Sequence, residues 1–179
     1  MIKLKPQLNL KKRKNMKKFK QFSLNFLFKI SEQPVLLRDL LEANALFNEG
    51  MLVDPAKLNY KFKTLNTYVY YGILCSLILL PLLLLTHHLL TLFDFHLSII
   101  SAVLVTAFVF IAYDIFKIYA RKIISKRLIK KAWNNHFPYF AYEKYSKIAE
   151  EIYKQALKDE IPKASLEKYV LEKIVEKSV

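Results

Sequence analysis

Three of the four histidines in this 179-residue chain fall within one stretch of ten residues, His87 to His96. They are His87, His88 and His96, and the acid Asp94 lies among them. Imidazole and carboxylate groups ligate divalent metals, and imidazole also titrates near neutral pH. Polar residues are equally required where a chain makes a short turn outside a lipid bilayer, and we favour that interpretation. The four residues are therefore only candidate metal ligands, and we expect no cofactor.

The second group with possible chemistry is Asp114, the one acid in the apolar segment 97–116. A carboxylate within a membrane is a candidate for proton coupling. Lys117 follows three residues later, close enough on a helix to form an ion pair. We favour such a pair at the membrane boundary over a proton-coupling site.

Other catalytic patterns are missing from the sequence. The two glycines, Gly50 and Gly72, are too few for a phosphate-binding loop or a dinucleotide fingerprint. Cys75 is the single cysteine, and His136 has no acidic or cysteine neighbour in sequence. Nothing indicates a nucleophile, so we expect a protein that is not an enzyme.

The elements that position these residues follow from the distribution of charge. Between Lys63 and Lys117 the chain runs 53 residues without a Lys or Arg, although it contains 29 of them. Within this gap, residues 67–86 have 15 apolar positions in 20, and residues 97–116 have 16 in 20. Twenty helical residues cover about 30 Å, the thickness of the hydrocarbon layer. We therefore predict an all-α membrane protein with a two-helix transmembrane hairpin and helical cytosolic N- and C-terminal halves, in preference to a soluble protein with a buried hairpin.

The orientation of the hairpin, residues 64–119, follows from the cations on either side of it. The turn at 87–96 has none, whereas Lys and Arg are frequent before the first span and after the second. Because Lys and Arg are retained on the cytoplasmic side, we expect a multi-pass protein of the inner membrane with both termini cytoplasmic and the turn external. Aromatic residues at both cytoplasmic ends predict an interfacial collar: Tyr60, Phe62, Tyr68, Tyr70, Tyr71, Tyr113, Phe116 and Tyr119.

Two blocks carry the net charge of +14. Residues 1–30 hold ten cations and no acid, and residues 117–137 hold seven and none. Both blocks adjoin the predicted membrane, and each cation near an anionic leaflet contributes roughly 1 kcal/mol. We expect anionic lipids of the inner leaflet to be partners, and nucleic acid not to be one. The predicted membrane-surface residues are Lys117, Arg121, Lys122, Lys126 and Arg127.

The segments before the hairpin are expected to differ from each other. Residues 1–20 have little apolar content and predict a basic arm that is disordered until it meets a surface. In the amphipathic segment 21–63, the residues from Phe22 to Ile30 fit either a strand or a helix, docked on lipid or on protein, and we favour a membrane-surface helix. A helix is expected between Pro34 and Gly50, and another from the cap at Asp54 directly into the first span.

The cytosolic region 120–179 is predicted to be helical throughout. The second span continues without Gly or Pro to Phe137, and Pro138 ends it. If this stem stands away from the membrane, Lys130 and Lys131 would attract a partner rather than lipid. The following helix has one Tyr-rich face, which must be buried against something. We predict partner contacts at seven residues: Trp133, Tyr142, Tyr145, Ile152, Tyr153, Phe22 and Phe26.

These features favour a non-enzymatic, two-span inner-membrane adaptor that assembles or stabilises a larger complex, such as secretion, motor or transport machinery. Its partner would be a membrane protein complex or a second copy of the chain. The halves on either side of the hairpin are expected to pack into one helical body. The alternative is a small oligomeric pore or transporter subunit that uses Pro81, Thr106 and Asp114. Small residues four apart, Gly72 and Ser76 in one span and Ser98, Ala102 and Thr106 in the other, would allow close helix contact in the hairpin or between copies.

Overall fold

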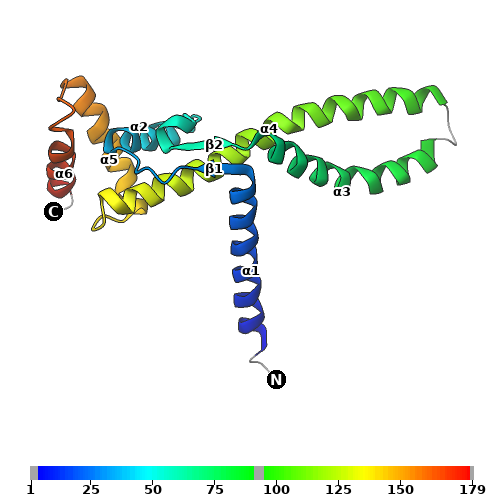
Figure 1. The fold of residues 1–179 in the computed structure, drawn as a ribbon, viewed down its shortest axis with the longest axis horizontal. Coiled ribbons are helices and arrows are strands. Elements are labelled where there is room, and N and C mark those ends of the chain that lie inside the picture. Colours follow the sequence, from blue (N-terminus) through cyan, green and yellow to red (C-terminus); the bar gives the residue numbers. More distant parts are fainter. Residues whose placement is uncertain (1–3, 91–94, 178–179) are drawn as a thin grey trace. The chain divides into compact units, whose positions relative to one another are not determined.

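The structure is a computed structural model that describes the backbone of residues 4–90 and 95–177. Side chains are described from residue 15 onward, apart from Lys17, Leu85 and residues 87–98. The chain is 78% helical, with six α-helices and one two-stranded sheet in the described part (Figure 1). It divides into a hairpin unit, Met1–Lys29 with Phe62–Lys117, and a body unit, Ile30–Lys61 with Ile118–Val179.

The hairpin unit contains the two apolar helices predicted from the sequence. Helix α3 covers Thr64–Leu90, and α4 covers Phe95–His136, of which the part up to Lys117 belongs to this unit. Both are long and apolar enough to cross a membrane. The two helices pack against each other near residues 68–71 of α3 and 109–116 of α4. The prediction that α4 continues past the apolar segment as one helix is confirmed.

The N-terminal residues differ from the sequence prediction. Helix α1 covers Leu4–Leu27, so the described part of segment 1–20 is helical where we expected disorder. Its single proline, Pro6, lies in the first helical turn, where the missing N–H is tolerated. The strand-or-helix ambiguity of residues 22–30 is resolved as both: the helix ends at Leu27, and strand β1 follows at Phe28–Ile30.

A second correction concerns the helix expected from Asp54 into the first span. Asp54 does cap a helical turn, since its carboxylate accepts a hydrogen bond from the Ala56 N–H at 2.9 Å. The helix is only the 3₁₀ turn η1, Pro55–Leu58, because Asn59 then adopts a left-handed conformation with φ 53°. Asparagine tolerates this region better than most residues, so Asn59 was the turn signal that the periodicity argument overlooked.

Strand β2, Tyr60–Phe62, follows that turn and pairs with β1. Backbone hydrogen bonds of 2.8 Å flank the pair, from Lys63 N to Leu27 O and from Ser31 N to Asn59 O. The register is therefore antiparallel. Neither three-residue strand is long enough to be stable alone, so each depends on a partner about thirty residues away in the sequence.

The body unit contains α2 (Leu37–Asn48), the end of α4, α5 (Tyr142–Lys158) and α6 (Leu166–Glu176). Gly50, with φ +81°, ends the α2 region, and α4 ends at His136 just before Pro138, both as predicted. Helix α5 packs on both α2 and α6. The most deeply buried side chains are Leu40, Leu41, Leu58, Tyr60, Ile124, Ile129, Trp133, Phe137, Ala149, Val170 and Ile174.

Hydrogen bonds join the two sequence halves of the body unit. Groups before the hairpin bond to groups after it at several points, and three of the residues after it, Arg121, Ser125 and His136, belong to α4. The expectation that both halves form one helical body is confirmed for Ile30–Lys61 with Ile118–Val179, whereas Met1–Lys29 belongs to the hairpin unit. The hydrogen bonds are Asn44 Nδ2 and Asn48 Nδ2 to Ser146 O (2.7 and 3.3 Å), Tyr60 Oη with Ser125 Oγ (3.2 Å), an Arg121 guanidinium N–H to Val53 O (3.0 Å), and His136 Nε2 with Val35 O (2.8 Å).

Candidate functional site

The hairpin unit gathers seven aromatic rings where α1, α3 and α4 meet, and we call them the aromatic cluster. Phe22 and Phe26 come from α1, Tyr68, Tyr70 and Tyr71 from α3, and Tyr113 and Phe116 from α4. Adjacent rings lie 5.0 to 6.4 Å apart between centroids, within the range of favourable aromatic pairs. Five of them belong to the predicted collar.

The other collar residues have separate environments. Phe62 pairs with Phe28 at 4.5 Å between ring centroids, and Tyr119 is exposed. Tyr60 is buried in the body unit beside Ser125, so its place in the collar was wrong. The cause is the Asn59 turn, which puts Tyr60 in a strand rather than on the helix that we expected.

The last turn of α1 is tied to the start of α3 by polar contacts. Lys63 Nζ and Asn66 Nδ2 donate to the carbonyls of Asn25 and Phe26, each at 2.9 Å. These carbonyls are among the last four of α1, which have no partner within the helix. The Lys63 ammonium also interacts favourably with the negative end of the helix dipole. A third bond, from Tyr70 Oη to Ser23 Oγ at 3.1 Å, lies one turn earlier on α1.

An ion pair lies beside the aromatic cluster. Lys117 Nζ is 2.7 Å from Asp114 and 4.7 Å from the centre of the Tyr113 ring. The predicted pairing of Asp114 is therefore confirmed. The Asp114 side chain is 71% exposed, and exposed pairs contribute about 0–1 kcal/mol to stability. The pair therefore positions the Lys117 side chain and contributes little to the stability of the fold.

The apolar surface of the hairpin unit is largely uncovered. Of the best 18-residue windows of α3 and α4, only 6% and 0% of residues are buried. Phe19 and Phe22 of α1 are each 65% exposed. Of the small residues that we expected to promote close packing, Gly72, Ser76, Ala102 and Thr106 are also exposed and do not form the contact within the hairpin.

Four predicted partner-contact residues are instead in the core of the body unit. Trp133 is fully buried, and its Nε1 donates to Phe140 O at 2.6 Å. Tyr142, Ile152 and Tyr153 of α5 are at most 8% exposed, and burial raises the pKa of both tyrosines. Tyr145 is half-buried, with its ring 5.1 Å from that of Phe140. The Tyr-rich face did require a cover, but other elements of the same chain supply it.

Only some of the predicted membrane-surface cations are exposed; others are half-buried or bound within the chain. Lys122 and Lys126 are exposed, whereas Arg127 is half-buried and Arg121 binds Val53 O. Lys130, which we expected to attract a partner, pairs with Glu143 and lies 5.2 Å from the Tyr142 ring centre. Its ammonium group lowers the pKa of the Glu143 carboxyl. Lys131 is exposed and lines a pocket.

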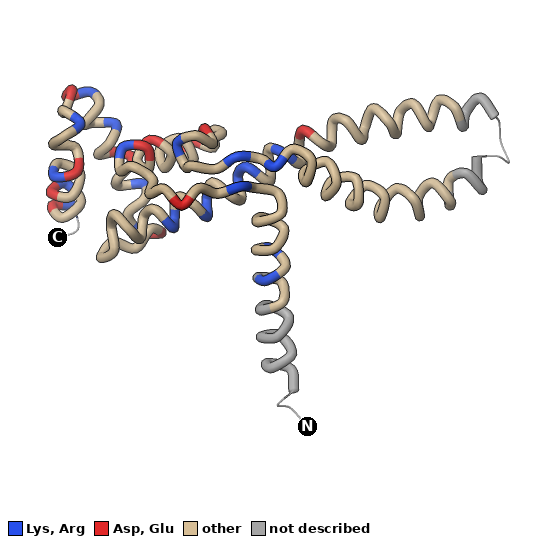
Figure 2. The backbone as a smooth tube through the Cα atoms, in the orientation of Figure 1, with Lys and Arg blue, Asp and Glu red and all other residues tan. Residues whose placement is uncertain are grey.

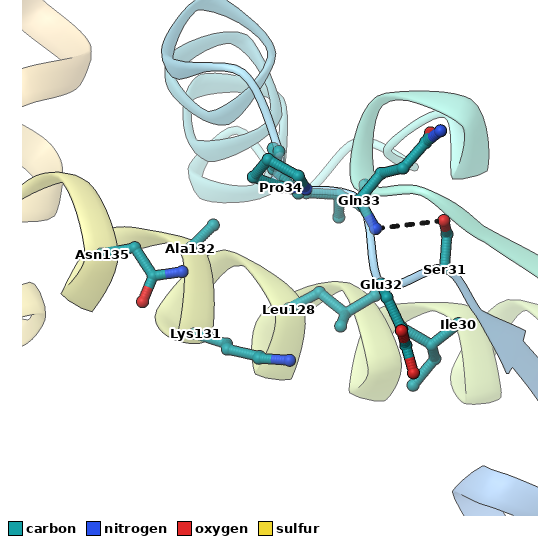
Figure 3. A pocket seen from close by; sticks show the side chains of 11 residues that line it. Ile30, Ser31, Glu32, Gln33, Pro34, Leu128, Lys131, Ala132 and Asn135 are labelled. Atoms are coloured by element: carbon teal, nitrogen blue, oxygen red, sulfur yellow. Dashed lines mark hydrogen bonds between the residues drawn. The ribbon is translucent and has the colours of Figure 1, made fainter.

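That pocket, which the sequence did not predict, lies in the body unit between the 30–35 segment and the stem of α4 (Figure 3). Its cavity volume is about 120 Å³, below the range of about 300 to 1,000 Å³ that is usual for small-molecule sites. Leu58, Leu128 and Ala132 supply apolar lining, and Glu32 and Lys131 supply one charge of each sign. No motif marks segment 30–35, so sequence reasoning had no signal there.

The proposed metal ligands His87, His88, Asp94 and His96 lie outside the residues whose side chains the structure describes. Among the described residues, no group of three or more His, Cys, Asp or Glu side chains is arranged to hold a metal ion. Comparison of the chain with protein-family models, curated proteins and solved structures finds no match.

Proposed function

We propose that the chain crosses the inner membrane twice and carries its body unit in the cytoplasm as a non-enzymatic adaptor or assembly factor for a larger membrane complex. The spans are residues 67–86 of α3 and 97–116 of α4, with residues 87–96 as the external turn. The exposure of these two apolar helices is the observation that carries the proposal.

The exposure argues against a soluble protein with the same sequence pattern. Long apolar helices of soluble proteins are buried in a core, and each large side chain gains about 1.5–3 kcal/mol from burial. Here many such side chains have no cover within the chain; Leu77, Leu84, Val103 and Phe108 are each more than 60% exposed. A lipid hydrocarbon layer is the environment that covers them on all sides.

Charge supports the direction of insertion. Figure 2 shows no Lys or Arg along the described hairpin, and basic residues are frequent in α1 and in the stem of α4. The positive-inside rule then favours cytoplasmic termini. Asp114 with Lys117, and the aromatic cluster beside them, have the residue types of a cytoplasmic membrane interface.

The adaptor role is supported by the construction of the body unit. It has its own core, built from side chains on both sides of the hairpin such as Leu41 and Trp133. Two exposed side chains are close in sequence to residues that line the pocket beside Lys131 or contact its lining. Leu36, 67% exposed, follows the lining residue Val35, and Tyr139, 93% exposed, comes three residues after His136, which contacts Val35. We propose this surface, called the pocket surface, as the partner contact.

The pore alternative has less support. Thr106 Oγ1 donates to Ala102 O of its own helix at 2.8 Å, and Asp114 is paired with Lys117. In the described part of the hairpin, neither side chain is therefore free to line a pore. Ion flux through reconstituted vesicles that is abolished by Asp114→Asn would favour the pore over the adaptor.

The test is site-specific photocrosslinking in native membranes. A benzophenone amino acid replaces Tyr139 at the pocket surface, and Leu157, 57% exposed at the end of α5, serves as the matched control. We expect one discrete crosslinked membrane-protein species from position 139 and not from 157. Extraction of the chain alone as a single monodisperse species, with no crosslink from position 139, would contradict the adaptor role.

A further inference from the structure

We infer that α1 is a membrane-surface helix whose Phe19 and Phe22 insert into the boundary between headgroups and acyl chains of an anionic leaflet. This inference rests on the proposed crossing of the membrane by the hairpin. It adds a third membrane contact, of a different kind from the two spans.

Three phenylalanines lie on one side of the described part of α1. At 100° per residue, Phe19, Phe22 and Phe26 fall within a sector of about 60°. Phe19 and Phe22 are exposed, and Phe26 is partly covered by the Tyr70 ring at 6.4 Å between centroids. Gln21 is exposed on another side of the helix. The uncovered apolar strip therefore starts at the aromatic cluster and reaches Phe19.

The attachment of α1 fixes where this strip begins. Asn66 and Tyr70 of α3 hold Phe26 and Ser23 of α1 through the hydrogen bonds described above. These α3 residues are at the start of the proposed span, at 67–86, so the end of α1 is held at the level of the membrane interface. Figure 1 shows that the last turns of α1, rather than its whole length, meet α3. The strip is thus not covered by the hairpin.

Charge identifies lipid as the occupant of the strip. Residues 1–30 contain ten cations and no acid, and Lys18 and Lys20 are exposed beside the two phenylalanines. Basic residues that flank an apolar face rich in Phe are the pattern of helices that lie in a membrane interface. Cations near an anionic surface are attracted to it, so several together hold the helix against the headgroups.

The test measures the depth of a fluorescent probe in vesicles that contain the full chain. In a Cys75→Ser background, a single cysteine carrying the nitrobenzoxadiazole dye is placed at Phe22, with a second strip position at Phe19. Gln21→Cys is the matched control on α1, and Leu77→Cys reports the hairpin. Vesicles are phosphatidylcholine with or without phosphatidylglycerol, and lipids with a spin label near the headgroup or deep in the acyl chain act as quenchers.

We expect the probes at 22 and 19 to be quenched by the shallow label severalfold more than the probe at 21, and more strongly when phosphatidylglycerol is present. Equal and weak quenching at 19, 21 and 22, with normal deep quenching at 77, would overturn this inference while leaving the crossing intact. Loss of deep quenching at 77 would instead refute the proposed crossing. A blue-shifted probe at 22 that no labelled lipid quenches would show that protein covers the strip, which also overturns the inference.

Discussion

Replacing Leu41 with Ala tests whether the body unit is one cooperative structure built from both sides of the hairpin. Leu41 lies in α2, before the hairpin, and is fully buried. Leu→Ala changes at such sites cost about 2.7–5 kcal/mol, through lost transfer free energy and the cavity that remains. We expect a cost of about 3 kcal/mol in the free energy of unfolding of the body unit.

The readout is the fluorescence of Trp133, the single tryptophan, which lies after the hairpin and is fully buried in the body unit. Urea unfolding in detergent micelles is followed by the shift of its emission to longer wavelength. With a slope of about 1.5 kcal/mol per molar urea, a loss of about 3 kcal/mol lowers the midpoint by about 2 M. A change made in one half of the sequence is thus detected in the other.

The matched control is Leu36→Ala, just before α2, because Leu36 is 67% exposed. Surface substitutions of this kind change stability by less than about 0.5 kcal/mol, so the midpoint should hardly move. If Leu41→Ala leaves the Trp133 transition unchanged, the two halves unfold independently and the single-body account is wrong. Equal effects of both variants would also refute it, because burial would then not decide the cost.

Three further predictions concern individual contacts. Tyr60→Phe removes one hydroxyl of the buried hydrogen-bonded pair with Ser125 and should cost about 1 kcal/mol of body-unit stability. Tyr119→Phe, at an exposed ring, should cost almost nothing, and urea unfolding compares the stabilities of the two variants. The Lys130 ammonium holds the pKa of the Glu143 carboxyl below its usual range, so the ion pair contributes to stability above the usual carboxylate pKa, and that contribution is lost as the pH falls through the lowered pKa. An NMR titration of Lys130→Gln should show the Glu143 pKa returning to normal, and an unchanged pKa would exclude the ion pair as its cause. Asn59→Ala should lower the urea midpoint of the body unit by the equivalent of about 1 kcal/mol because Ala is strained at φ 53°, and Asn59→Gly should lower it less. A larger loss in Asn59→Gly than in Asn59→Ala would show that the Asn59 side-chain hydrogen bonds matter more than its backbone conformation.

Local rules predicted the parts of the fold that depend on periodicity and caps. The two apolar helices, the unbroken α4, the Asp54 cap and the ends of helices at Gly50 and Pro138 all followed from short-range patterns. The pairing of Asp114 with Lys117 followed in the same way, since the two residues are three apart on one helix. In each case the deciding interaction lies within a few residues in the sequence.

Apart from the local turn at Asn59, several errors occurred where distant segments decide the outcome. Strands β1 and β2 exist because they pair with each other, and no window of the sequence contains both. The α5 face was correctly expected to be buried, and Trp133 was expected to contact a partner, but hydrophobic periodicity does not identify the covering surface. Here α2 and α6 cover α5, so the predicted partner contacts became core. The pocket beside Lys131 combines a loop and a helix about a hundred residues apart in the sequence. It could not be predicted because no local pattern shows that these two segments meet.

The most direct test of the account is the location of three cysteines, each introduced singly in a Cys75→Ser background and labelled with a membrane-impermeant maleimide in intact cells. One cysteine is added at the N-terminus, one at the C-terminus, and one replaces His88 in the turn. The account predicts labelling from outside only at position 88, and labelling of both termini only after the cells are opened. Labelling of one terminus from outside, or recovery of the unmodified chain in the soluble fraction, would contradict the double crossing from which the proposed function follows.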